Sequence, residues 1–362
     1  MKVRGLRNFG AGWIFGVDCR EQAVASSLRR IPCPTFVSGV VGEGRVEQQA
    51  AMPNRACLLL VLALSACAAS IAYADSSTPR LAAYYDRQLA ICAGDAYEWT
   101  GDEQPKKVMR DVLQVGVGKN ESYALSSDGR LHAWSSELRE AQALLEGVKS
   151  FAAGSSGVLA IKVDGSLWRV EHAGRLRPGR TPDAITTIAA NVRTASVGDG
   201  TNYYVTTDGD LFAQGNAHRG QYGDGRLDST PTYIRVAAGV IDIKSHTGHA
   251  ILLSGRGAVQ GTGGNIYGPL GRHGLGDKAV VWGPILDAAT GIATGASHSL
   301  AIRADTTLWS WGRNESPDPR QVLADVIGVA AGSDTSIALT RDGSLWQWRP
   351  GARPQRVFNC GL

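Results

Sequence analysis

The sequence predicts an all-β fold in which one unit of several antiparallel strands repeats around a β-propeller. A phrase of apolar residues and glycine recurs six times along the chain. An Asp-Gly pair divides several of these copies, and the segment after it often alternates as Leu-Trp-x-Trp. Glycine accounts for 45 of the 362 residues, which suits many short strands joined by tight turns.

The chain opens with two segments that we exclude from the fold. Residues 1–51 show no sustained period, and we expect them to be disordered upstream sequence, with Met52 the true start. Residues 52–74 are expected to be a signal peptide, because the apolar run 57–70 follows Arg55 and Ala72-Tyr73-Ala74 offers small residues for cleavage. The run is short for a membrane span. Residues 75–88 are then expected to be a linker.

The leader therefore predicts a secreted or periplasmic protein. An alternative is that the segment ending at Cys67 is a bacterial lipobox, in which case Cys67 would carry a lipid anchor to the envelope. Plain cleavage is favoured because apolar residues continue beyond Cys67. Of the six cysteines, only Cys92 and Cys360 lie outside the leader. An even pair in an exported chain indicates a disulfide.

Charge argues against nucleic acid as a partner. The formal net charge is only +4, and the first 80 residues are richer in Arg and Lys than in Asp and Glu. The remaining chain is therefore close to neutral. It lacks the clustered basic surface that phosphate binding needs, so we expect no nucleic-acid binding.

The six repeat copies begin with a branched or small apolar residue and end near a tryptophan or glutamine. The last copy reads Val-Ile-Gly-Val-Ala-Ala-Gly, then Ser-Ile-Ala-Leu, then Asp-Gly-Ser-Leu-Trp-Gln-Trp over residues 326–348. Asp-Gly favours a two-residue hairpin turn because both positions tolerate positive φ. Copies that start 36 to 49 residues apart match a propeller blade better than a helical repeat. The copies start at Val112, Val148, Val192, Val240, Ala289 and Val326.

The phrase resembles the regulator-of-chromosome-condensation repeat. Residues 293–302 and 308–314 follow that repeat closely, and its loop phrase G-Q-L-G-x-G returns at 220–225 and, in part, at 268–271. The resemblance covers residues 89–362 and implies a seven-bladed β-propeller closed by strands from both chain ends. On that alignment, residues 90–99 supply the second half of the closing blade and residues 357–360 its first half. Cys92 and Cys360 would then lie on neighbouring strands of one blade.

Candidate catalytic groups are better explained as structural residues. The aspartates of the Asp-Gly pairs, such as Asp128 and Asp342, fit turn chemistry. His249 and His298 occupy one repeated position, which favours a structural role, and the repeated tryptophans are expected to pack between blades. We predict no catalytic residue, no metal and no cofactor, because no catalytic motif and no metal-ligand spacing is present.

The strongest binding signal lies in two long junctions between repeats, 215–239 and 263–288. Loops that mix aromatic residues and arginine on a rigid scaffold are typical of protein-recognition surfaces. The alternative is that these are ordinary full-length junctions of the repeat. The candidate partner-binding residues are Arg219, Tyr222, Arg226, Tyr267, Arg272, His273 and Trp282.

These observations predict a monomeric, exported binding module that recognises a protein partner in the periplasm, envelope or medium. Inhibition of the partner fits, because the family that the repeat resembles includes a secreted bacterial β-lactamase inhibitor. One alternative is a metal-assisted lyase or hydrolase that uses His246, His249 and His273 on one propeller face. Nuclear guanine-nucleotide exchange, the role of the family's founding member, is disfavoured by the signal peptide and the near-neutral charge.

Overall fold

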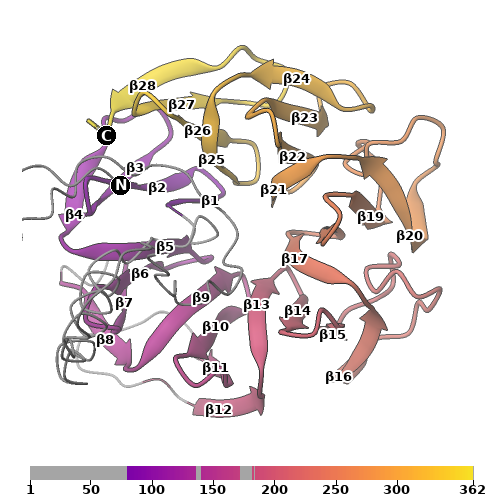
Figure 1. Ribbon diagram of the computed structural model, residues 1–362, viewed down its shortest axis with the longest axis horizontal. Coiled ribbons are helices and arrows are strands. Elements are labelled where there is room, and N and C mark those ends of the chain that lie inside the picture. Colours follow the sequence, from indigo (N-terminus) through magenta and orange to yellow (C-terminus); the bar gives the residue numbers. More distant parts are fainter. Residues whose placement is uncertain (1–79, 136–139, 172–181, 183, 362) are drawn as a thin grey trace, which may run out of the picture. The chain divides into compact units, whose positions relative to one another are not determined.

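A computed structural model describes residues 80–135, 140–171, 182 and 184–361. Within these residues the chain forms strands and turns and no helix, so the predicted all-β class is confirmed. Twenty-eight strands make seven four-stranded antiparallel sheets, which are the blades of a propeller (Figure 1). The leader, residues 1–74, lies outside the described residues.

Each blade uses four strands that follow one another in the sequence. Blade 1 holds β1 (Leu81–Tyr84), β2 (Arg87–Cys92), β3 (Asp95–Thr100) and β4 (Lys106–Met109). Blade 2 holds β5 (Val112–Val117), β6 (Ser122–Ser126), β7 (Leu131–Trp134) and β8 (Gln142–Leu145). Blade 3 holds β9 (Val148–Gly154), β10 (Gly157–Lys162), β11 (Leu167–Glu171) and β12 (Ala184–Ala189). Blade 4 holds β13 (Val192–Val197), β14 (Thr201–Thr206), β15 (Leu211–Gly215) and β16 (Thr230–Ala237). Blade 5 holds β17 (Val240–Ser245), β18 (His249–Ser254), β19 (Val259–Gly264) and β20 (Lys278–Leu286). Blade 6 holds β21 (Ala289–Thr294), β22 (His298–Arg303), β23 (Leu308–Gly312) and β24 (Arg320–Leu323). Blade 7 holds β25 (Val326–Ala331), β26 (Ser336–Thr340), β27 (Ser344–Trp348) and β28 (Gln355–Asn359).

The six repeat copies found in the sequence begin at the first strands of blades 2 to 7. We name the four strands of a blade A to D in chain order. Strand A lies nearest the middle of the ring and strand D at its rim (Figure 1). Because neighbouring strands are antiparallel, the A–B and C–D connections share one face of the ring, which we call the AB–CD face.

The core is divided among the interfaces between blades. Seven apolar clusters of the described residues each combine side chains of two adjacent blades. One of them joins blade 7 to blade 1, through residues such as Ile337 and Leu81. The chain of clusters therefore has no open end, and the ring is closed.

The closing blade differs from the sequence prediction. Among the described strands, no sheet combines strands from the two chain ends: blade 1 uses β1 to β4, and blade 7 uses β25 to β28. The segment 357–359 belongs to the outermost strand β28, and strand A of blade 1 is β1, within the range assigned to a linker. The alignment was wrong because β1, Leu-Ala-Ala-Tyr, lacks the valine and glycine of the repeat.

We call the junction of blades 1 and 7 the seam. Cys92 is the last residue of β2 in blade 1, and Cys360 comes directly after β28 in blade 7. The structure joins them in a disulfide with Cα atoms 4.6 Å apart. The two cysteines thus lie on adjacent blades and not on one blade. The indole Nε1 of Trp99 donates to Oε1 of Gln347 (2.6 Å) across the same junction. The seam therefore has apolar, polar and covalent ties.

The repeated glycine after strand A is explained by close contact between blades. A Cβ atom on Gly154 would lie 2.2 Å from the carbonyl oxygen of Val197, on the next blade. A Cβ atom on Gly332 would likewise lie 2.7 Å from the carbonyl oxygen of Tyr85. These positions need glycine because a neighbouring backbone occupies the space of a side chain. Five blades have glycine there, at Gly118, Gly154, Gly198, Gly295 and Gly332, while blade 1 has Tyr84 and blade 5 has His246.

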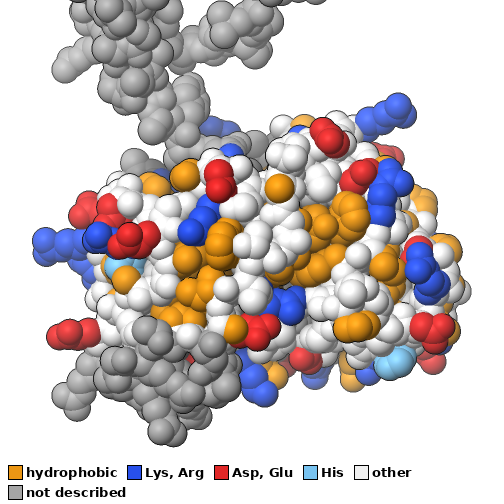
Figure 2. All heavy atoms as spheres, turned by 90° about the horizontal axis from the view of Figure 1, so that it is seen from below, with side chains coloured by type: hydrophobic (Ala, Val, Ile, Leu, Met, Phe, Trp, Pro, Cys, Tyr) orange, Lys and Arg blue, Asp and Glu red, His pale blue; other side chains and the backbone are white. Residues whose placement is uncertain are grey.

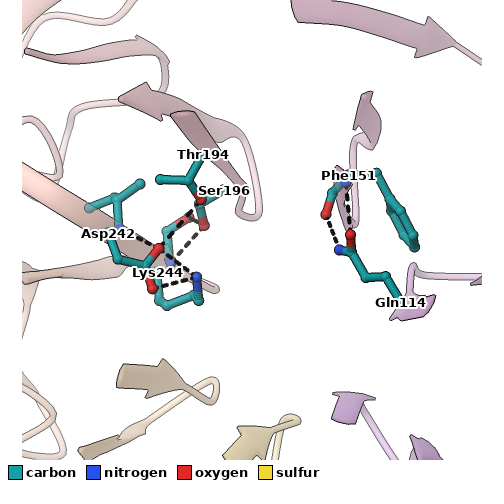
Figure 3. A network of polar contacts seen from close by, with 8 residues as sticks. Gln114, Phe151, Thr194, Ser196, Asp242 and Lys244 are labelled. Atoms are coloured by element: carbon teal, nitrogen blue, oxygen red, sulfur yellow. Dashed lines mark hydrogen bonds and ion pairs between the residues drawn. The ribbon is translucent and has the colours of Figure 1, made fainter. Parts of the chain in front are cut away.

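Polar side chains add ties between the inner strands. The amide of Gln114 on β5 hydrogen-bonds in both directions with the backbone of Phe151 on β9. Between β13 and β17, the hydroxyls of Ser196 and Ser245 lie 2.9 Å apart, and Lys244 pairs with Asp242 beside them (Figure 3). The centre of the ring is thus fastened by side chains as well as by packing.

Candidate protein-binding face

The predicted partner-binding residues lie in or beside two C–D loops on the AB–CD face. The loop 216–229 joins β15 to β16 in blade 4, and the loop 265–277 joins β19 to β20 in blade 5. Loops of this kind on a rigid scaffold commonly carry function. The structure separates the seven residues into a supporting group and an exposed group.

Tyr222 and Trp282 belong to the supporting group. The Tyr222 side chain is buried in the cluster between blades 4 and 5, and its hydroxyl donates to the carbonyl of Gly215 (2.6 Å). Trp282, on β20, packs against the same cluster and under Gly223, where a Cβ atom would lie 2.5 Å from its Nε1. These two residues therefore hold the loop of blade 4 in place, Tyr222 with a buried side chain and Trp282 with a half-buried one.

Arg219 and Arg226 are exposed on the same loop. The stem of Arg219 lies against Gly248 and Gly264 of blade 5. The guanidinium of Arg226 pairs with Asp224 at 2.8 Å. Both arginines face solvent, so a partner can reach them.

A recess of about 420 Å³ lies between the C–D loops of blades 5 and 6. Tyr267, which is 55% exposed, lines it together with Arg272, His273 and Arg313. The Arg313 guanidinium lies 5.4 Å from the centre of the Tyr267 ring and pairs with Asp334 at 3.0 Å. The backbone N–H of His273 donates to Asp318 of blade 6 (3.1 Å). Sequence reasoning missed Arg313, because the phrase around it was interpreted only as part of the repeat.

Arg272 has an unusual environment in this recess. Its Nε and Nη2 atoms are buried, and no acceptor for them occurs among the described residues. Removal from water lowers the pKa of the guanidinium. An arginine whose charge is desolvated and unpaired favours a nearby anionic group.

The histidines at the repeated position act between blades. Nε2 of His249 lies 3.0 Å from the Ser299 hydroxyl on blade 6, and Nε2 of His298 lies 2.9 Å from the Ser336 hydroxyl on blade 7. Burial lowers the pKa of His246 to about 4 and those of His249 and His298 to about 3. All three side chains are therefore neutral at pH 7. No group of three or more metal-ligating side chains is found in the part of the chain that the structure describes.

The Asp-Gly turns show the hydrogen bonds expected of turn residues. Asp342 accepts from the Thr340 hydroxyl (2.6 Å) and from the backbone N–H of Ser344 (3.0 Å), which lowers its pKa to about 2. The indole of Trp346 donates to the same Thr340 hydroxyl (3.1 Å). These carboxylates are occupied within their own hairpins.

Charge on the visible side of the ring is mixed. Figure 2, seen from the side where β12 and β16 lie in Figure 1, shows lysine and arginine interspersed with aspartate and glutamate. The same view shows hydrophobic side chains between them. No helix of the described residues is long and apolar enough to cross a membrane.

The fold and its loops thus define a seven-bladed β-propeller of a type that is typical of protein-binding modules. The family model of the regulator of chromosome condensation (RCC1) repeat matches residues 289–316. The repeated phrase found in the sequence is thus similar to the RCC1 repeat, and the seven blades are arranged as in an RCC1-type propeller.

Known proteins resemble the chain along part of its length. Mouse E3 ubiquitin-protein ligase HERC2 is 28% identical over 236 residues, which cover 57% of this chain and 5% of HERC2. The ultraviolet-B receptor UVR8 of Arabidopsis thaliana is 30% identical over 185 residues, or 46% of this chain and 42% of UVR8. The chain therefore spans less than half the length of these curated relatives.

Solved structures support the fold. Prp20p from Saccharomyces cerevisiae, studied with its binding to Gsp1p and histones, superposes with a TM-score of 0.59 at 18% identity. That superposition covers 71% of this chain and 81% of Prp20p. Yeast RCC1 (Prp20) bound to Kap60 gives a TM-score of 0.61 at 17% identity, covering 72% and 79% of the two chains.

Proposed function

We propose that the chain is an exported binding module whose AB–CD face recognises a protein partner. The observation that carries the proposal is the recess between blades 5 and 6, where the Arg313 guanidinium lies over the exposed ring of Tyr267. In the same recess, the Nε and Nη2 atoms of Arg272 have no acceptor among the described residues. Tyrosine and arginine are the residues that most often dominate binding energy at protein interfaces. Arg219 and Arg226 on the adjacent loop extend this surface.

The chemistry of the recess favours a partner that offers a carboxylate. Arg313 is already paired with Asp334, whereas Arg272 has no acidic group that affects its pKa. The proposed partner is a protein of the periplasm, envelope or medium, and inhibition is one form that such binding takes. The alternative of a metal-assisted lyase or hydrolase gains no support from the placement of His246, His249 and His273, because no three-ligand cluster occurs within the described ranges.

Capture experiments with matched variants test the binding proposal. The protein would be used as bait against envelope and medium fractions, beside a Tyr267→Ala, Arg313→Ala double variant. Val163→Asp is the control, because Val163 is 73% exposed in a B–C turn on the opposite face. We expect a protein that the wild type and the control retain and the double variant loses. Equal retention by all three baits would contradict the assignment of the face.

Export is proposed from the leader and from the cysteine pair. Replacing the apolar residues at 59–62 with charged ones should keep the protein in the cytoplasm, because the core of a signal peptide must be apolar. Removing residues 1–51 should leave export intact. Palmitate labelling that depends on Cys67 would support the lipoprotein alternative over plain cleavage.

A further inference from the structure

One pair of stacked rings crosses the middle of the propeller. The rings of Tyr84 and His246 have centroids 5.1 Å apart and planes inclined by only 15°. Tyr84 ends strand A of blade 1, and His246 follows strand A of blade 5. In a closed ring of seven, blades 6 and 7 separate these two on one side and blades 2 to 4 on the other. A direct contact between them must therefore span the axis.

The two residues occupy the same place in their blades. Each of them closes the hairpin between strands A and B by pairing with the residue three positions later. Tyr84 pairs in register with Arg87, and the N–H of His246 donates to the carbonyl of His249. In blade 2 the N–H of Gly118 donates to the carbonyl of Glu121 in the same way. This is the position at which the other five blades have glycine. The only two side chains larger than hydrogen in this belt are thus the two that stack on each other. The five glycines leave the space that the two rings fill.

Contacts with the remaining inner strands fix the pair. Both side chains are buried, at 8% and 9% exposure. The Tyr84 hydroxyl interacts with the side chain of Ser155 of blade 3, which acts against the effect of burial on the pKa of Tyr84. The Ser155 hydroxyl donates to the carbonyl of Gly198 on blade 4 (3.0 Å). The carbonyl of His246 accepts from the N–H of Asp199 (2.8 Å). The pair is therefore tied to blades 1, 3, 4 and 5.

We propose that Tyr84 and His246 form an axial clasp, which holds blades 1 and 5 together and closes the axis at the AB–CD face. The clasp is distinct from the seam, because the seam joins blade 1 to blade 7. It acts on the ring by preventing blade 1 from moving outward independently of blade 5. The exposed ring of Tyr85 packs edge-on against Tyr84, with the two ring centroids 4.9 Å apart.

Water exclusion by the clasp has a measurable signature. Burial raises the pKa of Tyr84 to about 12 and lowers the pKa of His246 to about 4, with Asp199 acting against the second shift. His249 and His298 are the other titratable groups that interact with His246. Removing the Tyr84 ring should admit water and raise the pKa of His246 toward 6.5.

A double-mutant cycle tests the clasp without any partner. Tyr84→Ala and His246→Ala would be made singly and together in the full chain, and amide exchange of β1 and β17 measured by mass spectrometry. Each single variant should speed exchange in both strands by about two- to tenfold, the effect of one aromatic pair. The double variant should be no faster than the singles, because one contact is lost in each case. Tyr84→Phe should keep slow exchange, and Tyr267→Ala, on the rim of the same face, should change neither strand.

Two results would overturn the proposal. One is independent effects, in which each variant speeds exchange only in its own strand and the double variant shows the product of both. The other is an unchanged pKa of His246 in Tyr84→Ala, measured by NMR of the imidazole. The second readout distinguishes a lost clasp from a general loss of stability, which would leave the His246 environment of the folded state as it was.

Discussion

Cys92→Ala should lower the stability of the protein more than any other single removal of a small buried side chain. The bond between Cys92 and Cys360 closes a loop of 268 residues. In the chain-entropy model, a cross-link of that length removes enough freedom from the unfolded chain to stabilise the fold by about 5 to 6 kcal/mol. For a domain of this size, such a loss corresponds to a fall in Tm of about 10 °C or more.

The structure also sets how the loss should appear. Both cysteines are buried at the seam, where apolar contacts and the Trp99–Gln347 hydrogen bond remain in the variant. The ring should therefore still form without the bond, and the change should be seen in stability rather than in fold. Thermal unfolding followed by circular dichroism would be measured under oxidising and reducing conditions.

Reductant provides the matching control. It should lower the Tm of the wild type by about as much as the substitution does, and it should leave the Tm of Cys92→Ala unchanged. The reasoning fails if the exported, non-reduced protein, from which the leader cysteines have been removed, contains two titratable thiols. It also fails if the variant and the wild type unfold at the same temperature.

Three further predictions concern the core and the loops. Acid should destabilise the protein between pH 7 and pH 5, because His246, His249 and His298 have lower pKa values in the folded state than the 6.5 of an unfolded chain. Their contribution to the free energy of unfolding is therefore complete above pH 6.5 and is lost as the pH falls. The loss should be about 2 kcal/mol of unfolding free energy for each histidine over this range. A urea midpoint that is the same at pH 5 as at pH 7 would contradict the burial of these side chains in the neutral form. Gly154→Ala should cost about 2 to 4 kcal/mol because its Cβ would meet the Val197 carbonyl, whereas Gly255→Ala, with its nearest atom at 3.6 Å, should be close to neutral in the same denaturation assay. Tyr222→Phe should lower the free energy of unfolding by about 1 to 3 kcal/mol, because the Gly215 carbonyl and the Thr230 N–H both lose their hydrogen-bond partner. A variant as stable as the wild type would show that these two bonds are not needed.

The repeat made most of the fold predictable. Six copies of one phrase located the first strands of six blades, because strand A must present the same glycine and apolar residues to each neighbouring blade. Blade 1 was misassigned because β1 keeps only the small and apolar character of that strand. Tyr84 stands where five of the other blades have glycine, and its ring packs against His246 on the opposite side of the axis. A contact between residues so far apart in the sequence leaves no local pattern from which it could be predicted.

The candidate site was only partly predictable for a similar reason. The long loops and their arginines were visible in the sequence, but burial decides which aromatic side chains face solvent. Tyr222 belongs to the glycine-rich loop phrase and is buried, while Tyr267 is exposed on the next loop. Arg313 became part of the surface only because the loop of blade 6 folds against that of blade 5.

The seam has a consequence for how this polypeptide could be rewired. The carbonyl of Arg80 accepts a hydrogen bond from Ile91 (2.8 Å), and the next residue, Cys92, lies 4.6 Å from Cys360 between Cα atoms. The two ends of the described propeller are therefore close neighbours, and a linker of a few residues could join 361 to 80. Since every blade is made of consecutive strands, new termini could be opened at any D–A connection. A family of circular permutants should thus fold to the same ring, each with a different pair of blades meeting at its new ends.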